Sequence, residues 1–344
     1  MALREIAELS NDYGADSDYV LAGGGNTSYK DEKFLYVKPS GVSLAKITEK
    51  DFVKMERAVV RECFGWSEFA DATEREERVK SLMAYAVAPG SSGRPSVEAP
   101  LHELMEFKFV VHLHPAAVNG MTCAAGGKKA CAELFPEALW VDYVDPGFTL
   151  AKFVYQANCA YREQHGKAPA VIFLQNHGVF VGSDSAEGIR RHYDHIMTVL
   201  RADYDRKGIA MNVAAEAGPD LTLVEGLAPQ LRGWLAEAGG VVTVRSAAPF
   251  KVAAGPLTPD HIVYAKSFAL CGETVSAESI AAFVQSKGYK PKVVAVPGKA
   301  VFAAGKNAGG AQTTLALALD AALVEQLTAA FGGVHYLDEA HRRF

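Results

Sequence analysis

His112 and His114, two histidines separated by a single residue, have the spacing that most directly suggests chemistry in this sequence. They end an apolar run over residues 109–114, which Pro115 closes. Side chains alternate between the two faces of an extended strand, so both imidazole rings are expected on the same face. Two such rings can bind one cation, and zinc is commonly bound by histidine nitrogen. A strand end with two incidental polar side chains would have the same sequence, so the pair alone leaves both interpretations open.

A third histidine, His177, stands in an Asn-His-Gly turn between two apolar runs within residues 170–182. A histidine in such apolar surroundings usually has a hydrogen-bonding or metal-binding role, because burying a polar ring without a partner is costly. Glu98 is the carboxylate of interest, although an acid at the start of a helix is often only a favourable first-turn charge. His102 follows it by four residues, on the same helical face, and is an alternative base.

Two turns rich in small residues have the composition of anion-binding loops. Residues 23–28 read Gly-Gly-Gly-Asn-Thr-Ser, and residues 38–41 read Lys-Pro-Ser-Gly. Glycines let a ligand approach the backbone, and neighbouring N–H and hydroxyl groups suit a phosphate. An ordinary hairpin turn would have a similar sequence. No helical pattern follows the glycines, which excludes a dinucleotide-binding fingerprint.

The elements that must position these residues alternate between helices and strands. In the first part we expect helices over residues 4–13, 74–85, 99–105, 115–123, 150–165 and 185–200, and strands over residues 18–22, 34–38, 109–114 and 140–144, with two more within 170–182. Beyond a linker-like segment at residues 214–220, we expect helices over residues 227–238 and 312–331 and strands over residues 241–244, 292–296 and 300–304. The predicted domains are therefore residues 1–215 and 220–344.

The Gly-Lys-Asn sequence at residues 305–307 is not a phosphate-binding P-loop. Six residues separate Gly298 from Gly305, where that motif has four, and Asn307 replaces the serine or threonine that binds magnesium.

The composition is that of an ordinary globular chain. The 344 residues are 49% hydrophobic and 22% charged, and the formal net charge of -5 argues against a nucleic-acid partner. No apolar stretch is expected to reach the roughly 20 residues that span a bilayer, so no membrane partner is expected. The five cysteines are scattered, which favours reduced thiols and a cytoplasmic location.

The order of these motifs resembles the class II aldolase/adducin family. The resemblance rests on residues 25–28, Ser40-Gly41, Ser96 with Glu98, His112-x-His114-Pro115 and Asn176-His177-Gly178, and it covers about the first 215 residues. The remaining residues resemble the extra segment of a long branch, the aldolase half of bifunctional rhamnulose-1-phosphate aldolase/alcohol dehydrogenases. The resemblance implies a three-layer α/β/α fold with a mainly antiparallel central sheet, followed by a smaller C-terminal α/β lobe.

The same resemblance implies roles for particular residues. His112, His114 and His177 would bind a divalent metal, most often zinc, and Glu98 would be the catalytic acid–base. The residues expected to hold a substrate phosphate are Gly25, Asn26, Thr27, Ser40, Gly41 and Ser96. The expected assembly is a homotetramer.

The function that we expect is that of a metal-dependent aldolase. It would reversibly cleave a ketose 1-phosphate of the rhamnulose or fuculose type into dihydroxyacetone phosphate and an aldehyde. Zinc held by three imidazoles keeps open positions for substrate oxygens and can act as a Lewis acid. The alternatives are a sugar-phosphate epimerase or dehydratase of the same fold, or a non-catalytic interaction protein like the adducin heads. For the C-terminal lobe, the turn with Asp260, His261 and Lys266 would face the sugar end of the cleft, or the lobe would be purely structural.

Overall fold

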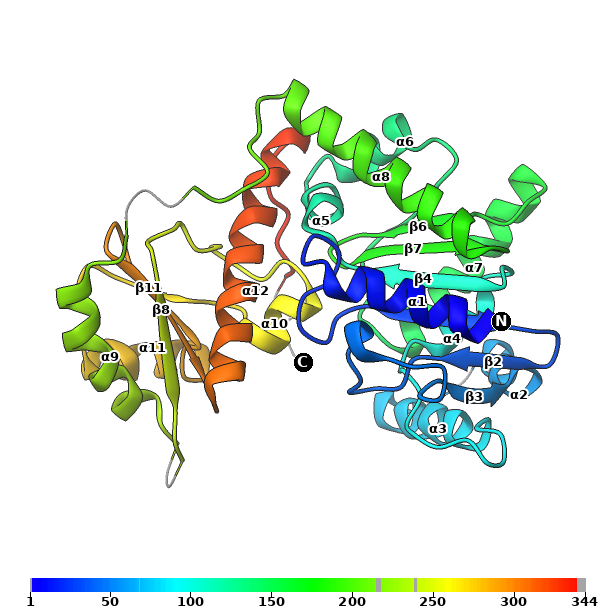
Figure 1. Cartoon of the computed structure of the whole chain (residues 1–344), viewed down its shortest axis with the longest axis horizontal. Helices are drawn as coiled ribbons and strands as arrows, with labels where there is room; N and C mark the ends of the chain where they lie inside the picture. Colours follow the sequence, from blue (N-terminus) through cyan, green and yellow to red (C-terminus); the bar gives the residue numbers. More distant parts are fainter. Residues whose placement is uncertain (1, 68, 215–217, 238–239, 339–344) are drawn as a thin grey trace. The chain divides into compact units, whose positions relative to one another are not determined.

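The computed structural model describes residues 2–67, 69–214, 218–237 and 240–338, which form two compact units (Figure 1). The N-terminal unit comprises Met1–Val118 and Lys128–Leu200, and the C-terminal unit comprises Asn119–Gly127 and Arg201–Phe344. The short segment 119–127 thus joins the C-terminal unit, although it lies within the first half of the sequence.

A seven-stranded sheet forms the centre of the N-terminal unit, with strand order β3-β2-β1-β4-β7-β6-β5. Every neighbouring pair is antiparallel except β5 and β6, so the expected mainly antiparallel sheet is confirmed. Its strands are β1 (Asn26–Lys30), β2 (Phe34–Val37), β3 (Val53–Glu56), β4 (Phe109–Leu113), β5 (Leu139–Val141), β6 (Val171–Leu174) and β7 (Gly178–Ser183).

Helices cover both faces of this sheet, which gives the three layers (Figure 1). On one face, α4 and α7 pack against Val110, Ile172 and Phe180 of the strands. On the other face lie α1 and α8, whose Tyr13 and Tyr193 rings are 5.0 Å apart and where the Tyr193 hydroxyl donates to Val111 O. The helices are α1 (Ala2–Ala15), α2 (Arg57–Arg61), α3 (Ala72–Tyr85), α4 (Ala99–Leu104), α5 (Ala116–Thr122), α6 (Gly127–Leu134), α7 (Phe148–His165) and α8 (Ala186–Arg206), with 3-10 turns at Leu44–Lys46 and Glu62–Gly65.

The expected strand over residues 18–22 is wrong, because this segment forms successive turns. The backbone N–H groups of Tyr19 and Val20 both donate to Asp16 O, and Ala22 has a φ of 54°. The Tyr19 ring packs on Tyr13, with 4.9 Å between the ring centroids. The apolar residues here therefore serve helix packing, and they make no ladder.

The short helix α4 is fixed by buried charged groups at its C-terminal end. Glu103 is buried and accepts from Arg57 at 3.0 Å and Arg61 at 2.6 Å, which ties α4 to α2. The buried Lys30 ammonium donates to His102 O at 2.5 Å and to Met105 O. These contacts satisfy carbonyls that a helix end leaves without partners, and they hold α4 against β1.

A four-stranded sheet with order β8-β11-β10-β9 forms the C-terminal unit, in which only β9 and β10 are parallel. On one face, Leu227 and Leu231 of α9 and Ile280 of α11 pack against Phe302. The elements are α9 (Leu221–Leu235), β8 (Thr243–Ala247), α10 (Pro259–Ala265), β9 (Leu270–Cys271), α11 (Ala277–Lys287), β10 (Val293–Val296), β11 (Ala300–Gly305), α12 (Ala308–Leu327) and a 3-10 turn at Thr328–Phe331.

The expectation that no segment has the length and apolarity of a bilayer span is wrong for Ala308–Phe331. Within this stretch of 24 residues, a window of 18 residues has a mean hydropathy of 1.4, and half of that window is buried inside the protein. Its helix α12 packs on α10, where His261 Nε2 and Asp320 Oδ2 are 2.8 Å apart. Its apolar residues thus contribute to the core of the C-terminal unit.

Candidate metal and catalytic site

Strand β4 brings two of the candidate histidines together at its C-terminal end. His112 is fully buried, His114 follows the strand directly, and their Nε2 atoms are 2.8 Å apart. The rings lie on the same side of the strand, as the alternation of side chains requires.

The turn between β6 and β7 places His177 beside this pair. Asn176 has a φ of 52°, in the left-handed region that asparagine tolerates well, and His177 N donates to Leu174 O at 3.2 Å. The His177 ring centroid is 5.0 Å from those of both His112 and His114. Gly178 permits this approach, because a Cβ there would lie 2.6 Å from His114 Cδ2.

Hydrogen bonding fixes which nitrogen of His112 faces the cluster. His112 Nδ1 is 3.0 Å from Val179 O, and since a carbonyl can only accept, Nδ1 carries the proton. The Nε2 lone pair therefore points toward His114. Burial, followed by the neighbouring His114 and His177 rings, lowers the pKa of His112 well below its usual value, so the ring is neutral at pH 7.

This arrangement fits a divalent cation. The ring nitrogens of His112, His114 and His177 all lie within 4.8 Å of one another, and they form the one such donor cluster among the described residues. Tetrahedral zinc with Zn–N bonds of about 2.0–2.1 Å would separate its ligand nitrogens by roughly 3.4 Å, close to these distances. Two lone pairs facing each other at the short His112–His114 separation would repel without a proton or cation between them.

Glu98 lies next to the histidine cluster. It is the N-cap residue of α4 and is buried, with Oε1 at 3.7 Å from His112 Nε2 and 3.6 Å from His177 Nε2. Its other oxygen, Oε2, accepts from Asn26 Nδ2. The structure thus brings Glu98 and the three histidines together from separate segments of the chain.

The register of β1 against β4 places the first glycine turn at the same site. Asn26 pairs with His112, and Gly25, with a φ of 74°, brings its Cα so close that a Cβ would lie 2.9 Å from His112 O. Thr27 points to the opposite face, where its Oγ1 is 2.7 Å from Ser10 Oγ of α1. Within this turn, Asn26 presents its side chain to the site, whereas the Thr27 hydroxyl bonds to Ser10.

The second small-residue turn meets the segment that precedes Glu98. Ser40 N donates to Arg94 O at 2.9 Å and Ser40 Oγ donates to Pro95 O at 3.2 Å. Gly41 has a φ of 83° and is exposed, and the buried Ser96 accepts from Glu98 N through Oγ at 3.2 Å. Ser96 also lines a cavity of about 760 Å³ beside α3, together with Arg94.

Lys38 also belongs to this site. The sequence alone predicts only that it is a positive charge beside the second turn. It is buried at 4% exposure. Burial lowers the pKa of its ammonium, and the negative charge of Glu98 opposes that shift. A buried lysine near the Glu98 carboxylate is a strong source of positive potential for an anionic ligand.

His102, the alternative base, belongs to the packing beneath the site. It is fully buried, with Nδ1 at 2.8 Å from Ser28 Oγ. Burial, with Lys30 and Lys38 adding to it, lowers its pKa to about 3. Its ring lies against Phe180, which stacks on His112. His102 thus supports the His112 ring from below.

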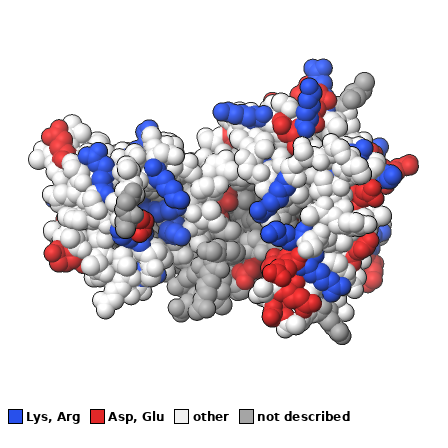
Figure 2. All heavy atoms as spheres, turned by 90° about the horizontal axis from the view of Figure 1, so that it is seen from below, with Lys and Arg blue, Asp and Glu red and all other residues white. Residues whose placement is uncertain are grey.

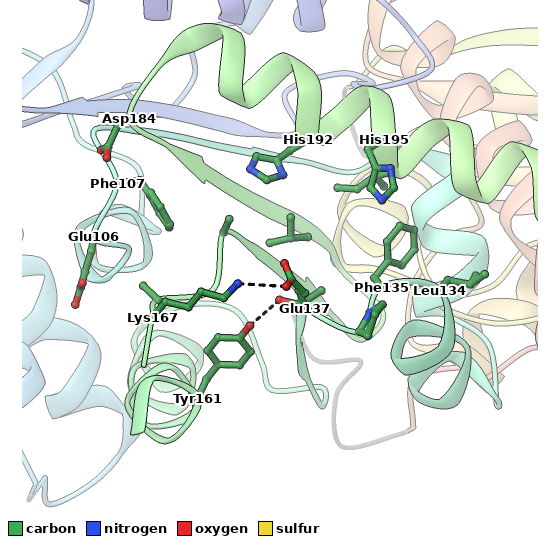
Figure 3. Close-up of a pocket in the computed structure, with 16 residues that line it drawn as sticks. Glu106, Phe107, Leu134, Phe135, Glu137, Tyr161, Lys167, Asp184, His192 and His195 are labelled. Carbon is green, nitrogen blue, oxygen red and sulfur yellow. Dashed lines mark hydrogen bonds and ion pairs between the residues drawn. The ribbon is translucent and has the colours of Figure 1, made fainter. Parts of the chain in front are cut away.

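A second cavity of about 740 Å³ lies near the start of β6 and the end of β7, beside Phe107 and Val171 (Figure 3). His192 and His195 of α8 line it, outside the histidine cluster of the metal site. Two of its charged groups pair with each other, since Lys167 Nζ and the Glu137 carboxylate are 3.3 Å apart.

Residues 4–203 match the family described as Class II Aldolase and Adducin N-terminal domain. The chain belongs to this family. The expected fold class and family are therefore confirmed. Among solved structures, this class II aldolase family member is similar to the N-terminal class II aldolase domain of a conserved protein from Thermoplasma acidophilum. The two share 24% identity over 59% of this chain and 93% of that chain, with a TM-score of 0.50, which shows the common fold.

Two further similarities concern proteins whose names state an activity. An uncharacterized oxidoreductase, YuxG of Bacillus subtilis (strain 168), is 27% identical over 197 residues, which are 54% of this chain. The match spans only 27% of the length of that relative. An L-fuculose-1-phosphate aldolase from Thermus thermophilus is 16% identical over 59% of this chain and 93% of that chain, with a TM-score of 0.39.

Proposed function

We propose that this chain is a metal-dependent aldolase that reversibly cleaves a ketose 1-phosphate of the rhamnulose or fuculose type, giving dihydroxyacetone phosphate and an aldehyde. The observation that carries this proposal is the buried Glu98 carboxylate, 3.6–3.7 Å from two of three clustered histidines. A base beside a set of neutral nitrogen ligands is the equipment for moving a proton on a carbon next to a carbonyl group.

In this proposal, His112, His114 and His177 hold one divalent cation, and zinc is the cation that three imidazoles suit best. A bound zinc ion supplies Lewis acidity, which polarises the carbonyl and hydroxyl oxygens of the ketose. The chain's own contribution is orientation: Val179 O fixes the His112 tautomer, and the Asn176 turn presents His177.

Glu98 moves the proton through Oε1. The Asn26 amide donates a hydrogen bond to Oε2, whereas Oε1 faces the histidines. In the cleavage direction, Oε1 takes the proton of the C4 hydroxyl, whose oxygen becomes the aldehyde carbonyl as the C3–C4 bond breaks. The electron pair of that bond remains on C3, and Oε1 then delivers the proton to C3. In the condensation direction, the same oxygen removes the proton from C3 and returns it to the C4 oxygen as the C3–C4 bond forms.

The substrate phosphate is assigned to the two turns beside the cluster. Backbone N–H groups at Gly25 and Gly41, the Asn26 amide and the Ser96 hydroxyl supply donors there, and Thr27 contributes through its backbone. The Ser40 hydroxyl would exchange its bond to Pro95 O for one to the phosphate. The buried ammonium of Lys38 supplies the cation that a phosphate dianion requires.

A binding module without catalysis has no need for a buried carboxylate beside three clustered histidines, which favours an enzyme over an adducin-like role. The Bacillus relative is named an oxidoreductase, but this chain matches only about a quarter of its length. That name therefore does not favour a redox reaction for this chain. We further propose that the enzyme is a homotetramer.

The test combines metal analysis with a substrate panel. Purified protein is expected to contain about one divalent metal per chain, and His177→Ala is expected to lose most of it, while the exposed His165→Ala retains it. Release of dihydroxyacetone phosphate from rhamnulose or fuculose 1-phosphate would then be followed in a coupled assay. Equal metal in wild type and His177→Ala would contradict the metal site. Isomerisation or dehydration of a sugar phosphate without cleavage would contradict the aldolase.

A further inference from the structure

The C-terminal unit contains a strongly basic segment within an acidic chain. Residues 241–312 hold eight Lys and Arg against three Asp and Glu, a formal charge of +5 where the whole chain carries -5. Figure 2 shows several of the Lys and Arg side chains of this unit close together on one face, on the left of that view. A local excess of this size creates a positive potential that attracts anions.

Three lysines of this segment converge at one end of the small sheet. Lys292 precedes β10 and its carbonyl accepts from Ala304 N, which places it beside the end of β11, where Lys306 follows Gly305. The Lys292 ammonium is 3.0 Å from Tyr264 O, at the C-terminal end of α10. Lys266, the residue that ends α10, follows Tyr264 by two residues. Segments far apart in sequence thus deliver three cations to one place.

The backbone of Lys266 has a conformation that lysine rarely adopts. Its φ of 70° and ψ of 164° lie in a region that is essentially restricted to glycine. The side chain is held there, because its Nζ lies 5.6 Å from the centroid of the Tyr289 ring, and the Tyr289 hydroxyl accepts from Phe268 N. A lysine kept where glycine would be free of strain indicates that its ammonium has a use.

These lysines also lack compensating carboxylates. Among the described residues, none of Lys266, Lys292 and Lys306 forms an ion pair, although other lysines of this unit do, such as Lys251 with Glu325 at 2.9 Å. Burial lowers the pKa of Lys292, and the positive charges of Lys266 and Lys306 lower it further. Two hydrogens of Lys292 are used by Val263 O and Tyr264 O, so part of its role is to cap α10.

We propose that Lys266, Lys292 and Lys306 form an anion site in the C-terminal unit that binds the phosphate groups of a small phosphorylated ligand. The ligand class follows from charge. A single phosphate ester brings about -1.5 to -2 charge, whereas the cluster carries three positive charges, so two linked phosphate groups match it better. This site uses no residue of the histidine cluster, and the proposal does not depend on the aldolase reaction.

The experiment measures binding of inorganic pyrophosphate to the full-length chain by titration calorimetry at low ionic strength. Lys266→Gln/Lys306→Gln removes two of the converging charges. Lys251→Gln/Lys299→Gln removes the same charge from the same unit outside the cluster and is the matched control. His177→Ala shows whether any pyrophosphate binds at the histidine cluster. We expect binding at least tenfold weaker in the first double variant, and a change below twofold in the other two proteins.

Lys266→Gly separates a binding role from a structural one. Glycine relieves the backbone strain, so this variant is expected to melt at a higher temperature than wild type while binding pyrophosphate more weakly. Absence of binding in wild type, equal weakening in both double variants, or loss of binding in His177→Ala would each overturn the proposal. If these lysines bound duplex DNA but no pyrophosphate, the proposal of a small phosphorylated ligand would be wrong and the ligand would be a polymer.

Discussion

The two carboxylate oxygens of Glu98 have different neighbours. Oε2 is bound by the Asn26 amide, and Oε1 faces His112 and His177. We expect Glu98→Gln to keep the metal content of wild type and to lower the rate of cleavage by about 10²–10⁴, because an amide is nearly isosteric but cannot carry the proton. Metal analysis and steady-state kinetics check the two halves of this prediction. Activity near that of wild type would move the base elsewhere.

Lys38 gives a second test at the scale of one side chain. If its buried ammonium holds the substrate phosphate, Lys38→Met should raise KM for a ketose 1-phosphate about tenfold or more, the value of a hydrogen bond to a charged group. The exposed Lys33→Met, near the start of the same strand β2, is the control and should leave KM unchanged. An unchanged KM in Lys38→Met would remove this residue from the phosphate site.

At this scale the sequence predicted residue types better than residue surroundings. Strand alternation alone predicts that His112 and His114 share a face, and the structure agrees. The placement of Asn26 opposite His112, and of Thr27 toward Ser10, depends on the pairing of β1 with β4, two strands far apart in the sequence. No local pattern contains that register. The convergence of Lys266, Lys292 and Lys306 could not be predicted, because these lysines are far apart in the sequence and the net charge of the whole chain hides a basic segment.

Among the elements, the turn into β7 is the most sensitive to a small change. A methyl group at Gly178 would meet both His114 Cδ2 and Leu113 O at 2.6 Å. We expect Gly178→Ala to lower the free energy of unfolding by about 1–3 kcal/mol and to weaken metal binding, since the ring and the strand must separate. Gly226→Ala in α9, where space is open, is the control and should not destabilise. Urea denaturation and metal titration check both; full metal affinity in Gly178→Ala would show that the cluster tolerates the shift.

The buried lysine that caps α4 makes stability depend on pH. Burial lowers the pKa of Lys30 from 10.5 to about 7, so between these values the unfolded chain binds more protons than the folded one. The free energy of unfolding should therefore rise with pH from 7 to about 9.5, by up to about 1.4 kcal/mol per pH unit from this group. Lys30→Met should lack that rise. Urea denaturation at several pH values gives the slope of the free energy of unfolding against pH for wild type and for Lys30→Met. The contributions of other titrating groups cancel in the difference between the two slopes. Equal slopes in the two proteins would contradict the prediction.

Sequence periodicity located most elements but not their ends. The helix expected over residues 312–331 begins four residues earlier, at Ala308, because Asn307 caps it by accepting from Gly310 N at 2.8 Å. The helix expected to end at residue 200 continues to Arg206. At Asn307 local capping decided the boundary, and hydrophobic spacing carries little of that information.

For the whole molecule, the proposed tetramer is the testable property. Closed symmetry is the usual state of soluble oligomers, and the family resemblance implies four chains. Sedimentation equilibrium at micromolar concentration should give a mass of four chains of 36.8 kDa each. A monomer under those conditions would contradict the proposed tetramer. The relation of the C-terminal turn to the sugar end of the cleft stays a prediction.

The pairing of β4 with β7 has a consequence for how the chain reaches its native state. Leu113 lies opposite Val179 and His112 opposite Phe180, and a slip of one residue would turn the His112 ring to the face that α1 and α8 cover. Any cation that binds all three histidines therefore binds the correctly aligned sheet and no slipped competitor. A free cation at about 100 times its dissociation constant would favour that alignment by about 2.7 kcal/mol. Beyond its part in the reaction, the ion would therefore favour refolding to the native register of β4 against β7 over a slipped register.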